Sequence, residues 1–216
     1  HGKGFRSYLD YNPDQNPPRF RLFLGEHIQV VHVLLLPLYW IWPSHLTLEF
    51  CESLALAVGA IPVFWMTQRH TQSRRAGIWL ACAYLLYFPL HFLDIEVDFK
   101  TFRPICFGVP AVLFALDQCE RGRFKSMLLL LAVALSAKED YAMIVAPLGV
   151  WIALTKPTDN SRPLKTRRWL GTALAVFGVL YLLCVIKFAI PYFRGGDVHY
   201  VRYFPPELGD SPGAMV

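Results

Sequence analysis

The feature that most constrains this chain is the alternation of long uncharged apolar stretches with short clusters of arginine and lysine. Hydrophobic residues make up 55% of the 216 residues and charged residues only 17%, and the mean hydropathy is +0.36. A soluble domain of this length usually carries about 25% charged residues. Because the apolar residues come in blocks that end in basic clusters, the sequence predicts an all-α, polytopic transmembrane helix bundle.

Five apolar segments have the composition of membrane crossings, and one of them is a hairpin with two arms. They are residues 46–66, 76–93, 104–118, 126–137 with 141–154, and 169–191. The chain therefore has about five to six membrane-entering helices, depending on whether the hairpin counts as one segment or as two arms. Residues 28–42 are too short for a crossing and end in Tyr39, Trp40 and Trp42, which favours a helix in the membrane interface.

We expect a single transmembrane domain over residues 1–216. Residues 1–45 would form an outer loop with the interfacial helix, residues 46–191 the transmembrane helices, and residues 192–216 an outer tail. The chain begins at His1 without an initiator methionine. We therefore expect it to be a fragment of a longer protein.

The charges of the connecting loops predict an orientation in the membrane. Loops 67–75, 119–125 and 155–168 hold eleven basic residues, whereas loops 94–103 and 138–140 hold three basic residues against five acids. Basic loops stay on the cytoplasmic side, so the acidic loops, the N-terminal segment and the tail should face outward. The basic residues form no continuous face, and the net charge of +5 therefore gives no indication of nucleic-acid binding.

The charged turn Lys138-Glu139-Asp140 is the strongest candidate for a functional site. The preceding arm, residues 126–137, would rise about 18 Å, well short of the ~30 Å hydrocarbon core. Because the loops on both sides of the hairpin are basic, the turn should lie at membrane depth, where ionisable groups usually serve a function. Lys138 suits a phosphate, with Glu139 or Asp140 orienting it. The alternatives are a turn in which Lys138 pairs with these acids, or a turn nearer the surface.

Two acidic segments of the predicted outer region are further candidates. Asp94, Glu96 and Asp98 alternate along the chain, which would place three carboxylates on one side of an extended segment. Such a cluster could bind a divalent cation, act as a general base or orient sugar hydroxyls, or it could be a solvated acidic loop. Glu26 and His27 form an acid/base pair in principle, although a helix-start glutamate beside a solvated histidine is the simpler explanation.

The remaining ionisable residues carry weaker signals. Glu49 and Glu52 could face the same cavity, or they could suit the dipole at a helix N-terminus. No pair of histidines has metal-ligand spacing and the five cysteines show no CxxC motif, so we predict no metal site. Walker-type glycine-rich motifs are absent from the sequence. The sequence also gives no indication of an oligomeric state.

Several stretches together resemble a known family. They are residues 24–27, 34–39, 42–44, 54–63, 98–99, 138–140 and 201–203. The combination resembles the bacterial membrane proteins catalogued as domain of unknown function 2079. That family is similar in turn to the GT-C superfamily of polytopic glycosyltransferases, which typically move a sugar from a polyprenyl-phosphate donor to an acceptor on the outer side of the membrane.

The resemblance implies a GT-C-like fold in the bacterial inner (plasma) membrane, with membrane lipids and a polyprenyl-phosphate sugar donor as partners. It also implies that the first crossing lies upstream of residue 1, so that this fragment lacks it. The resemblance implies no cofactor, and a divalent cation is an alternative that only the carboxylates of the acidic loop leave open. A carboxylate among Asp98, Asp94 and Glu26 would deprotonate the acceptor, while Lys138 would stabilise the leaving phosphate. His27 is a weaker candidate for contact with the substrate. The alternative is a membrane transporter or a lipid-binding membrane protein without catalysis, with the same cavity holding a solute.

Overall fold

The computed structural model describes residues 6–7, 21–22, 24, 27–95, 102–155 and 164–194. The chain divides into two compact units, His1–Ile28 with Leu180–Val216 and Gln29–Val179, and each is described by itself. The described residues are helical or connecting except for one pair of two-residue strands, which confirms the all-α prediction. The expectation of a single domain over residues 1–216 stays a prediction.

The smaller unit contains the strand pair and the C-terminal helical segment. β1 (Arg6–Ser7) runs antiparallel to β2 (Arg21–Leu22). The last helix passes through one π-helical turn, η4 (Val185–Ala189), before α10 (Ile190–Arg194). Pro191 in α10 has no N–H and its ring would clash with the carbonyl four residues earlier. A wider turn just before it relieves that clash.

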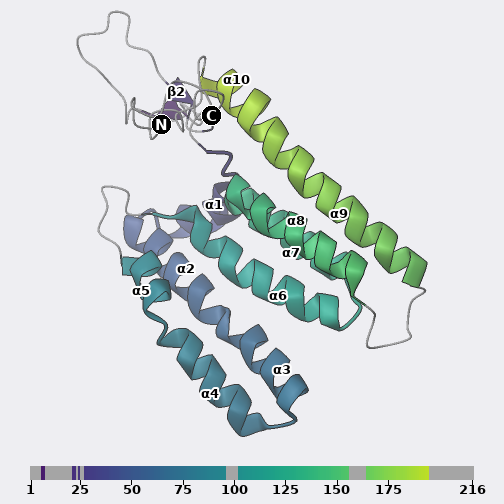
Figure 1. Cartoon of the computed structure of the whole chain (residues 1–216). Coiled ribbons are helices and arrows are strands. Elements are labelled where there is room, and N and C mark those ends of the chain that lie inside the picture. The colour runs from purple at the N-terminus through teal and green to yellow at the C-terminus, as the bar shows by residue number, and fades with distance from the viewer. Residues whose placement is uncertain are drawn as a thin grey trace, which may run out of the picture. The chain divides into compact units, whose positions relative to one another are not determined.

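The larger unit is a set of helices (Figure 1). In chain order these are α1 (His32–Ile41), α2 (His45–Val58), α3 (Ala60–Thr71), α4 (Arg74–Leu85), α5 (Phe88–Ile95), the 3-10 turn η2 (Pro104–Phe107), α6 (Gly108–Glu120), α7 (Phe124–Ala137), the 3-10 turn η3 (Glu139–Tyr141), α8 (Ala142–Leu154) and the first part of α9 (Leu164–Cys184). α3 packs against α4 and α6 against α7. Gly122, whose φ of 68° lies in the left-handed region that favours glycine, closes the α6–α7 turn.

Prolines account for the breaks in the longer helices. Pro62 cannot donate to the carbonyl four residues before it, and α2 and α3 separate nearby at Gly59. The hydroxyl of Tyr84, from α4, donates to the Leu56 carbonyl at this break over 2.9 Å. Pro89 stands near the start of α5, where α4 and α5 meet at a bend of 45°. Each break therefore lies beside a residue that lacks a backbone donor.

Among the described residues, two helices are long and apolar enough to cross a membrane. One is His45–Thr71, with 27 residues, which combines α2 and α3 across their break. The other is Lys165–Phe193, with 29 residues, which continues from α9 through η4 into α10. The bent pair of α4 and α5 brings the number to three if it counts as one span, whereas α1 and α7 are apolar but shorter. The expected number of five to six membrane-entering helices stays a prediction.

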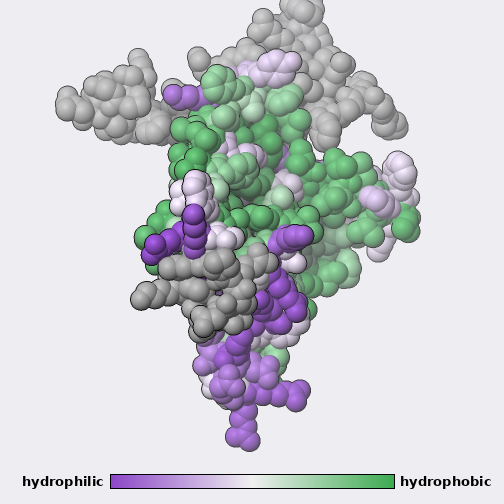
Figure 2. Space-filling view, turned by 90° about the vertical axis from the view of Figure 1, so that its right-hand side faces the viewer, coloured by the Kyte–Doolittle hydropathy of each residue, from purple (hydrophilic) through white to green (hydrophobic). Residues whose placement is uncertain are grey.

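Large apolar side chains are exposed over much of the larger unit. Trp40, Trp79 and Leu154 are among the most exposed. Figure 2 shows hydrophobic residues over large parts of the face on view and hydrophilic residues mainly in its lower half. Soluble monomeric proteins rarely expose an apolar surface of this extent, whereas the hydrocarbon core of a bilayer would surround it favourably.

Small residues let α8 and α9 pack with their backbones in contact. A Cβ atom placed on Gly171 would lie 2.5 Å from the backbone nitrogen of Ala153, and one on Gly178 would lie 2.8 Å from that of Ala146. Gly149 of α8 meets the backbone of Ala175 in the same way. This spacing of small residues is typical of helix pairs in membranes, where close approach replaces hydrophobic burial as the source of attraction.

Candidate functional site

The charged turn lies where the chain passes from α7 into α8. α7 ends at Ala137, Lys138 has an extended backbone, and η3 then leads the chain into α8. With 14 residues, α7 rises only about 21 Å, less than the ~30 Å hydrocarbon core. The short arm predicted before this turn is therefore confirmed, and the depth of the turn in the membrane stays a prediction.

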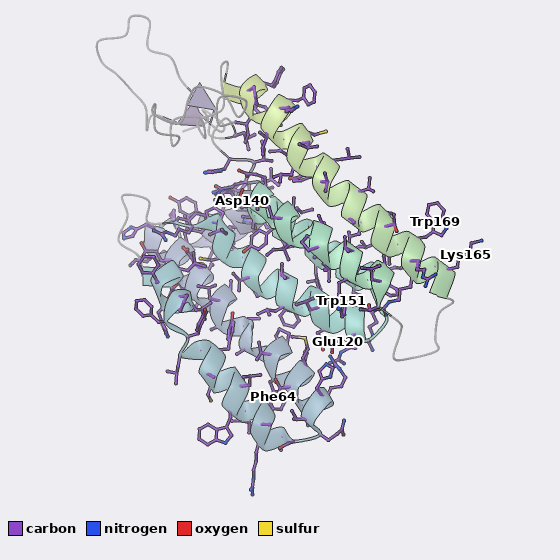
Figure 3. All side chains as sticks on the ribbon, viewed as in Figure 1. Phe64, Glu120, Asp140, Trp151, Lys165 and Trp169 are labelled. Carbon is purple, nitrogen blue, oxygen red and sulfur yellow. The ribbon has the colours of Figure 1, made fainter. Side chains whose placement is uncertain are left out.

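Lys138 pairs with one of the two acids that follow it. Its Nζ lies 2.7 Å from Oδ2 of Asp140, with the lysine side chain 21% exposed and the aspartate 41% exposed. Glu139, between them, is fully buried. Figure 3 shows Asp140 at the end of the helices. The structure therefore contains the ion pair that the sequence analysis gave as an alternative to a phosphate site. An ammonium has three donors, so Lys138 can contact Asp140 and an anion at the same time.

Backbone and hydroxyl contacts fix the position of the turn. The carbonyl of Ser136, in the last turn of α7, accepts hydrogen bonds from the N–H groups of Val30 (2.8 Å) and Val31 (3.0 Å). The hydroxyl of Tyr141 donates to the carbonyl of Ile105 in η2 over 2.7 Å. The ring of Tyr141 lies so close to Gly108 that no side chain would fit there. The turn is therefore held from two sides.

A second polar centre joins α2, α5 and η2. Glu52 is only 2% exposed, and its carboxylate accepts from the thiol of Cys106 (2.9 Å) and the N–H of Arg103 (3.2 Å). The neighbouring Ser53 hydroxyl donates to Oδ1 of Asp94 over 2.8 Å. Glu52 entered the sequence analysis only as a weak candidate. A carboxylate within an apolar helix was the signal that could have ranked it higher.

η2 connects this centre to the charged turn. Cys106 contacts Glu52, and the preceding residue, Ile105, accepts the hydrogen bond from Tyr141. The structure therefore brings Asp94 and Glu52 to the same end of the larger unit as Lys138.

The other predicted site residues fare differently. α5 continues through Ile95, so Asp94 ends a helix, and the expectation of an extended segment is wrong at this point. The apolar periodicity of α5 simply carries past the first acid. Asp98 and Glu26 lie outside the described residues. His27 belongs to the smaller unit and is half-buried.

The opposite end of the helices carries an ion-pair network that the sequence analysis missed. Asp117 is fully buried, with Arg69 and Arg121 each 2.8 Å from one of its oxygens. Glu120 contacts Arg69 (2.7 Å) and His70 (3.0 Å). Partial burial works to raise the pKa of Glu120, but the hydrogen bonds from His70 and Arg69 outweigh it and lower that pKa. Two predicted basic loops, 67–75 and 119–125, are thus joined.

The third basic loop reaches the same end through Arg167 at the start of α9. Its guanidinium donates to the Ile152 carbonyl (3.3 Å) and the Thr155 hydroxyl (3.1 Å) and lies 5.9 Å from the ring centre of Trp151. In Figure 3, Trp151 and Glu120 lie toward one end of the helices and Asp140 toward the other. The alternation of basic and acidic loops along the chain therefore becomes a separation between two ends.

Within the described ranges, no group of three or more His, Cys, Asp or Glu side chains is arranged to hold a metal ion. Of the three acids of the acidic loop, Glu96 and Asp98 lie outside the described residues.

No curated protein and no solved structure matches the chain. The family model described as predicted membrane protein (DUF2079) matches residues 1–204, nearly the whole chain. This agrees with the apolar helices and exposed apolar surface described above. The chain belongs to the DUF2079 family of predicted membrane proteins.

Proposed function

We propose that this chain is part of an integral membrane glycosyltransferase. The enzyme would transfer a sugar from a polyprenyl-phosphate donor to an acceptor at the outer face of the membrane. The observation that carries the proposal is the half-buried Lys138 at the end of the short helix α7, with carboxylates at the same end of the bundle. The resemblance to the GT-C superfamily supports the class of reaction.

Lys138 would bind the phosphate of the donor. Its ammonium is a compact charge with three donors, and Asp140 at 2.7 Å holds it in place. As the bond between the anomeric carbon and the phosphate oxygen breaks, negative charge grows on that oxygen. A fixed cation beside it lowers the energy of the transition state. Glu139, fully buried between the two, would help to orient the turn.

A carboxylate would accept the proton of the acceptor hydroxyl. Asp94 is the described candidate, because it is half-buried, it is oriented by Ser53, and it lies in the centre that η2 links to the charged turn. Asp98 and Glu26 stay in the same proposed role, and His27 stays a weaker candidate for contact with the substrate.

The orientation belongs to the same proposal. Arg69, Arg121 and Arg167 gather at one end of the helices and the charged turn lies at the other. Basic residues favour the cytoplasmic side, which supports an outward-facing Lys138 in a bacterial inner membrane.

One observation favours the second candidate, a lipid-binding membrane protein or transporter without catalysis. Asp140 already pairs with Lys138, and a turn that only neutralises its own charges would have the same pair. Incubation with a labelled polyprenyl-phosphate sugar separates the two, because only the enzyme forms a sugar–acceptor product. Retention or vesicle uptake of the intact donor without such a product would favour the second candidate.

The phosphate site is tested by Lys138→Ala, with Lys125→Ala at the exposed start of the same helix as the control. Hydrogen bonds to charged groups contribute about 1.5–3 kcal/mol, so Lys138→Ala should weaken binding of a polyprenyl phosphate in lipid nanodiscs by about 10- to 100-fold. Binding of the uncharged polyprenol should not change. Equal binding of the phosphate by both variants would remove Lys138 from the proposal.

A further inference from the structure

Gln29 is a buried polar residue that the site described above does not use. It is only 6% exposed. Other buried polar side chains have partners: the hydroxyl of Thr47 donates to the carbonyl of Trp42 over 2.8 Å, and Asp117 is held by two arginines. The side-chain amide of Gln29 has no hydrogen-bond partner among the residues that the structure describes. An unpaired buried amide destabilises a fold, so it needs a reason to be there.

The backbone of Gln29 lies against the last turn of α7. The N–H of Val30, which belongs to the peptide bond that follows Gln29, donates to the carbonyl of Ser136 over 2.8 Å. Ser136 comes two residues before Lys138. The carbonyl of Gln29 in turn accepts a hydrogen bond from Nδ1 of His32 over 3.0 Å. The backbone of Gln29 is therefore fixed close to the charged turn.

Aromatic contacts join the same segment to η2. The ring of His32 meets the ring of Phe102 edge-on, with 5.4 Å between their centres, and Phe102 lies 6.1 Å from Phe107 of η2. η2 also accepts the hydrogen bond from Tyr141 in the charged turn. The segment that begins at Gln29 therefore packs against α7 and η2, the two elements that adjoin the charged turn, and all of these residues belong to the larger unit.

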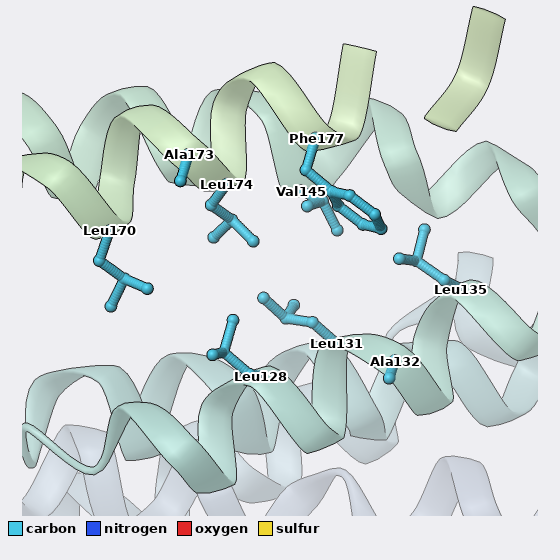
Figure 4. Close-up of a pocket in the computed structure, with 9 residues that line it drawn as sticks. All are labelled: Leu128, Leu131, Ala132, Leu135, Val145, Leu170, Ala173, Leu174 and Phe177. Carbon is cyan, nitrogen blue, oxygen red and sulfur yellow. The ribbon is translucent and has the colours of Figure 1, made fainter. Parts of the chain in front are cut away.

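The apolar groove between α7 and α9 offers no alternative place for polar recognition. Its volume is about 400 Å³, and all nine side chains that line it are apolar. Figure 4 shows these side chains, among them Leu131, Leu135 and Leu174, with no donor or acceptor in their midst. A polar, uncharged part of a ligand bound at Lys138 has to be recognised outside this groove.

The chemistry of an amide indicates what kind of group it would recognise. Gln29 carries a donor and an acceptor side by side. A hydroxyl group likewise both donates and accepts, whereas a phosphate is an acceptor that a lysine matches better. A site built to hydrogen-bond a hydroxyl also rejects an analogue that lacks it, because the buried group is then left unpaired. The amide of Gln29 therefore fits a sugar hydroxyl better than a phosphate.

We propose that Gln29 recognises the sugar of the donor, with its amide hydrogen-bonded to a sugar hydroxyl while Lys138 binds the phosphate. The inference rests on the proposed function and adds a specificity-determining residue to it. Since the sugar is bonded directly to the phosphate, its recognition belongs beside Lys138, where the segment of Gln29 lies.

Gln29→Met tests the proposal, because it removes the amide and keeps an unbranched side chain of similar length. Without ligand, this variant of the full chain in lipid nanodiscs should unfold at the same temperature as wild type or at a higher one, since an unpaired buried group is lost. Gln118→Met is the matched control. The Gln118 amide donates to Oδ2 of Asp117 over 3.0 Å at the opposite end of the larger unit, so this variant should lose stability and keep its binding.

The probes are a bare polyprenyl phosphate and polyprenyl phosphates that carry glucose, galactose or mannose. We expect wild type to bind the best of these sugars at least about threefold more tightly than the bare phosphate. Gln29→Met should bind that sugar probe about 3- to 10-fold more weakly, as for one hydrogen bond between uncharged groups, and should bind the bare phosphate as wild type does.

Monodeoxy analogues of the same sugar complete the cycle between protein and ligand. One analogue should bind wild type about 3- to 10-fold more weakly than its parent sugar and should bind Gln29→Met no more weakly than the parent. Gln29→Asn, whose amide is one methylene shorter, enters the same cycle if the methionine variant fails to fold.

Three results overturn the proposal: no gain in wild-type affinity from any of the sugars, an equal loss for the bare phosphate in Gln29→Met, or a deoxy series whose effects are the same in both proteins. Lys138→Ala separates this inference from the proposed function. Weakened binding of both probes in the lysine variant, with normal binding in Gln29→Met, would leave the phosphate site standing without the sugar contact. Normal binding in Lys138→Ala with a selective loss in Gln29→Met would support the sugar contact and contradict the phosphate site.

Discussion

Asp117 and Glu52 are both buried carboxylates on largely apolar helices, but their partners differ. Two guanidinium groups hold Asp117, whereas a thiol and a backbone N–H donate to Glu52. A buried ion costs several kcal/mol of lost hydration unless it is paired and hydrogen-bonded. Asp117 therefore joins α3 to α6 by charge, while Glu52 positions η2, which in turn positions the charged turn.

Asp117→Ala should destabilise the protein by about 1.5–3 kcal/mol, because it removes the charge-assisted contacts of Arg69 and Arg121, although Arg69 keeps Glu120. Asp140→Ala is the matched control, since that aspartate also pairs with a cation but is 41% exposed. Exposed pairs contribute about 0–1 kcal/mol. Thermal unfolding in detergent measures both. A similar loss in the two variants would mean that the buried network contributes no more than an exposed pair.

Glu120 makes the stability of the same end depend on pH. Its pKa is lowered in the folded protein, because hydrogen bonds from His70 and Arg69 outweigh the opposing effect of burial. The carboxylate therefore stabilises the fold above its unfolded pKa of about 4.3, and this contribution is lost as the pH falls through the lower folded value. We expect wild type to be more stable than Glu120→Gln at pH 7 and this difference to shrink below about pH 4. A difference that stays constant down to pH 3 would contradict this.

At the scale of helices, the positions that the sequence predicted well are those where charge ends an apolar run. The arm expected at 126–137 is α7 (Phe124–Ala137), and the segment 104–118 corresponds to η2 with α6. Basic clusters mark these ends because charged groups leave the hydrocarbon. The contact between Arg69 and Asp117 was not predictable, since it joins residues 48 apart and no local pattern encodes it. The tight α8–α9 contact likewise depends on which faces of two helices meet.

That contact provides a test of the packing. Gly171→Leu should separate α8 from α9 and destabilise the larger unit by about 1–3 kcal/mol, because the new side chain would collide with the backbone at Ala153. Thr172→Leu adds a similar side chain at the next position, which is exposed, and should have little effect. The unfolding temperatures in detergent compare the two. If both variants melted alike, α8 and α9 would not be packed through their glycines.

For the whole molecule, the two ends of the larger unit differ in chemistry. Arginines of three loops are joined to acids, carbonyls and a tryptophan ring at one end, while Lys138, Asp140, Glu52 and Asp94 lie around η2 at the other. Because α7 and α8 run between these ends, the charge pattern along the sequence matches the geometry of the bundle. Such a difference favours one orientation in a bilayer, with the arginine-rich end on the cytoplasmic side.

The orientation is tested from outside the cell with a membrane-impermeant maleimide on Arg123→Cys, in the α6–α7 turn, and Asp140→Cys, in the charged turn. Both positions have solvent exposure, and the wild-type chain run in parallel gives the background from its exposed native cysteines, Cys82 and Cys184. We expect intact cells to label the Asp140→Cys peptide and to label the Arg123→Cys peptide only after permeabilisation. The reverse pattern would place Lys138 on the cytoplasmic side, where the proposed transfer at the outer face could not take place.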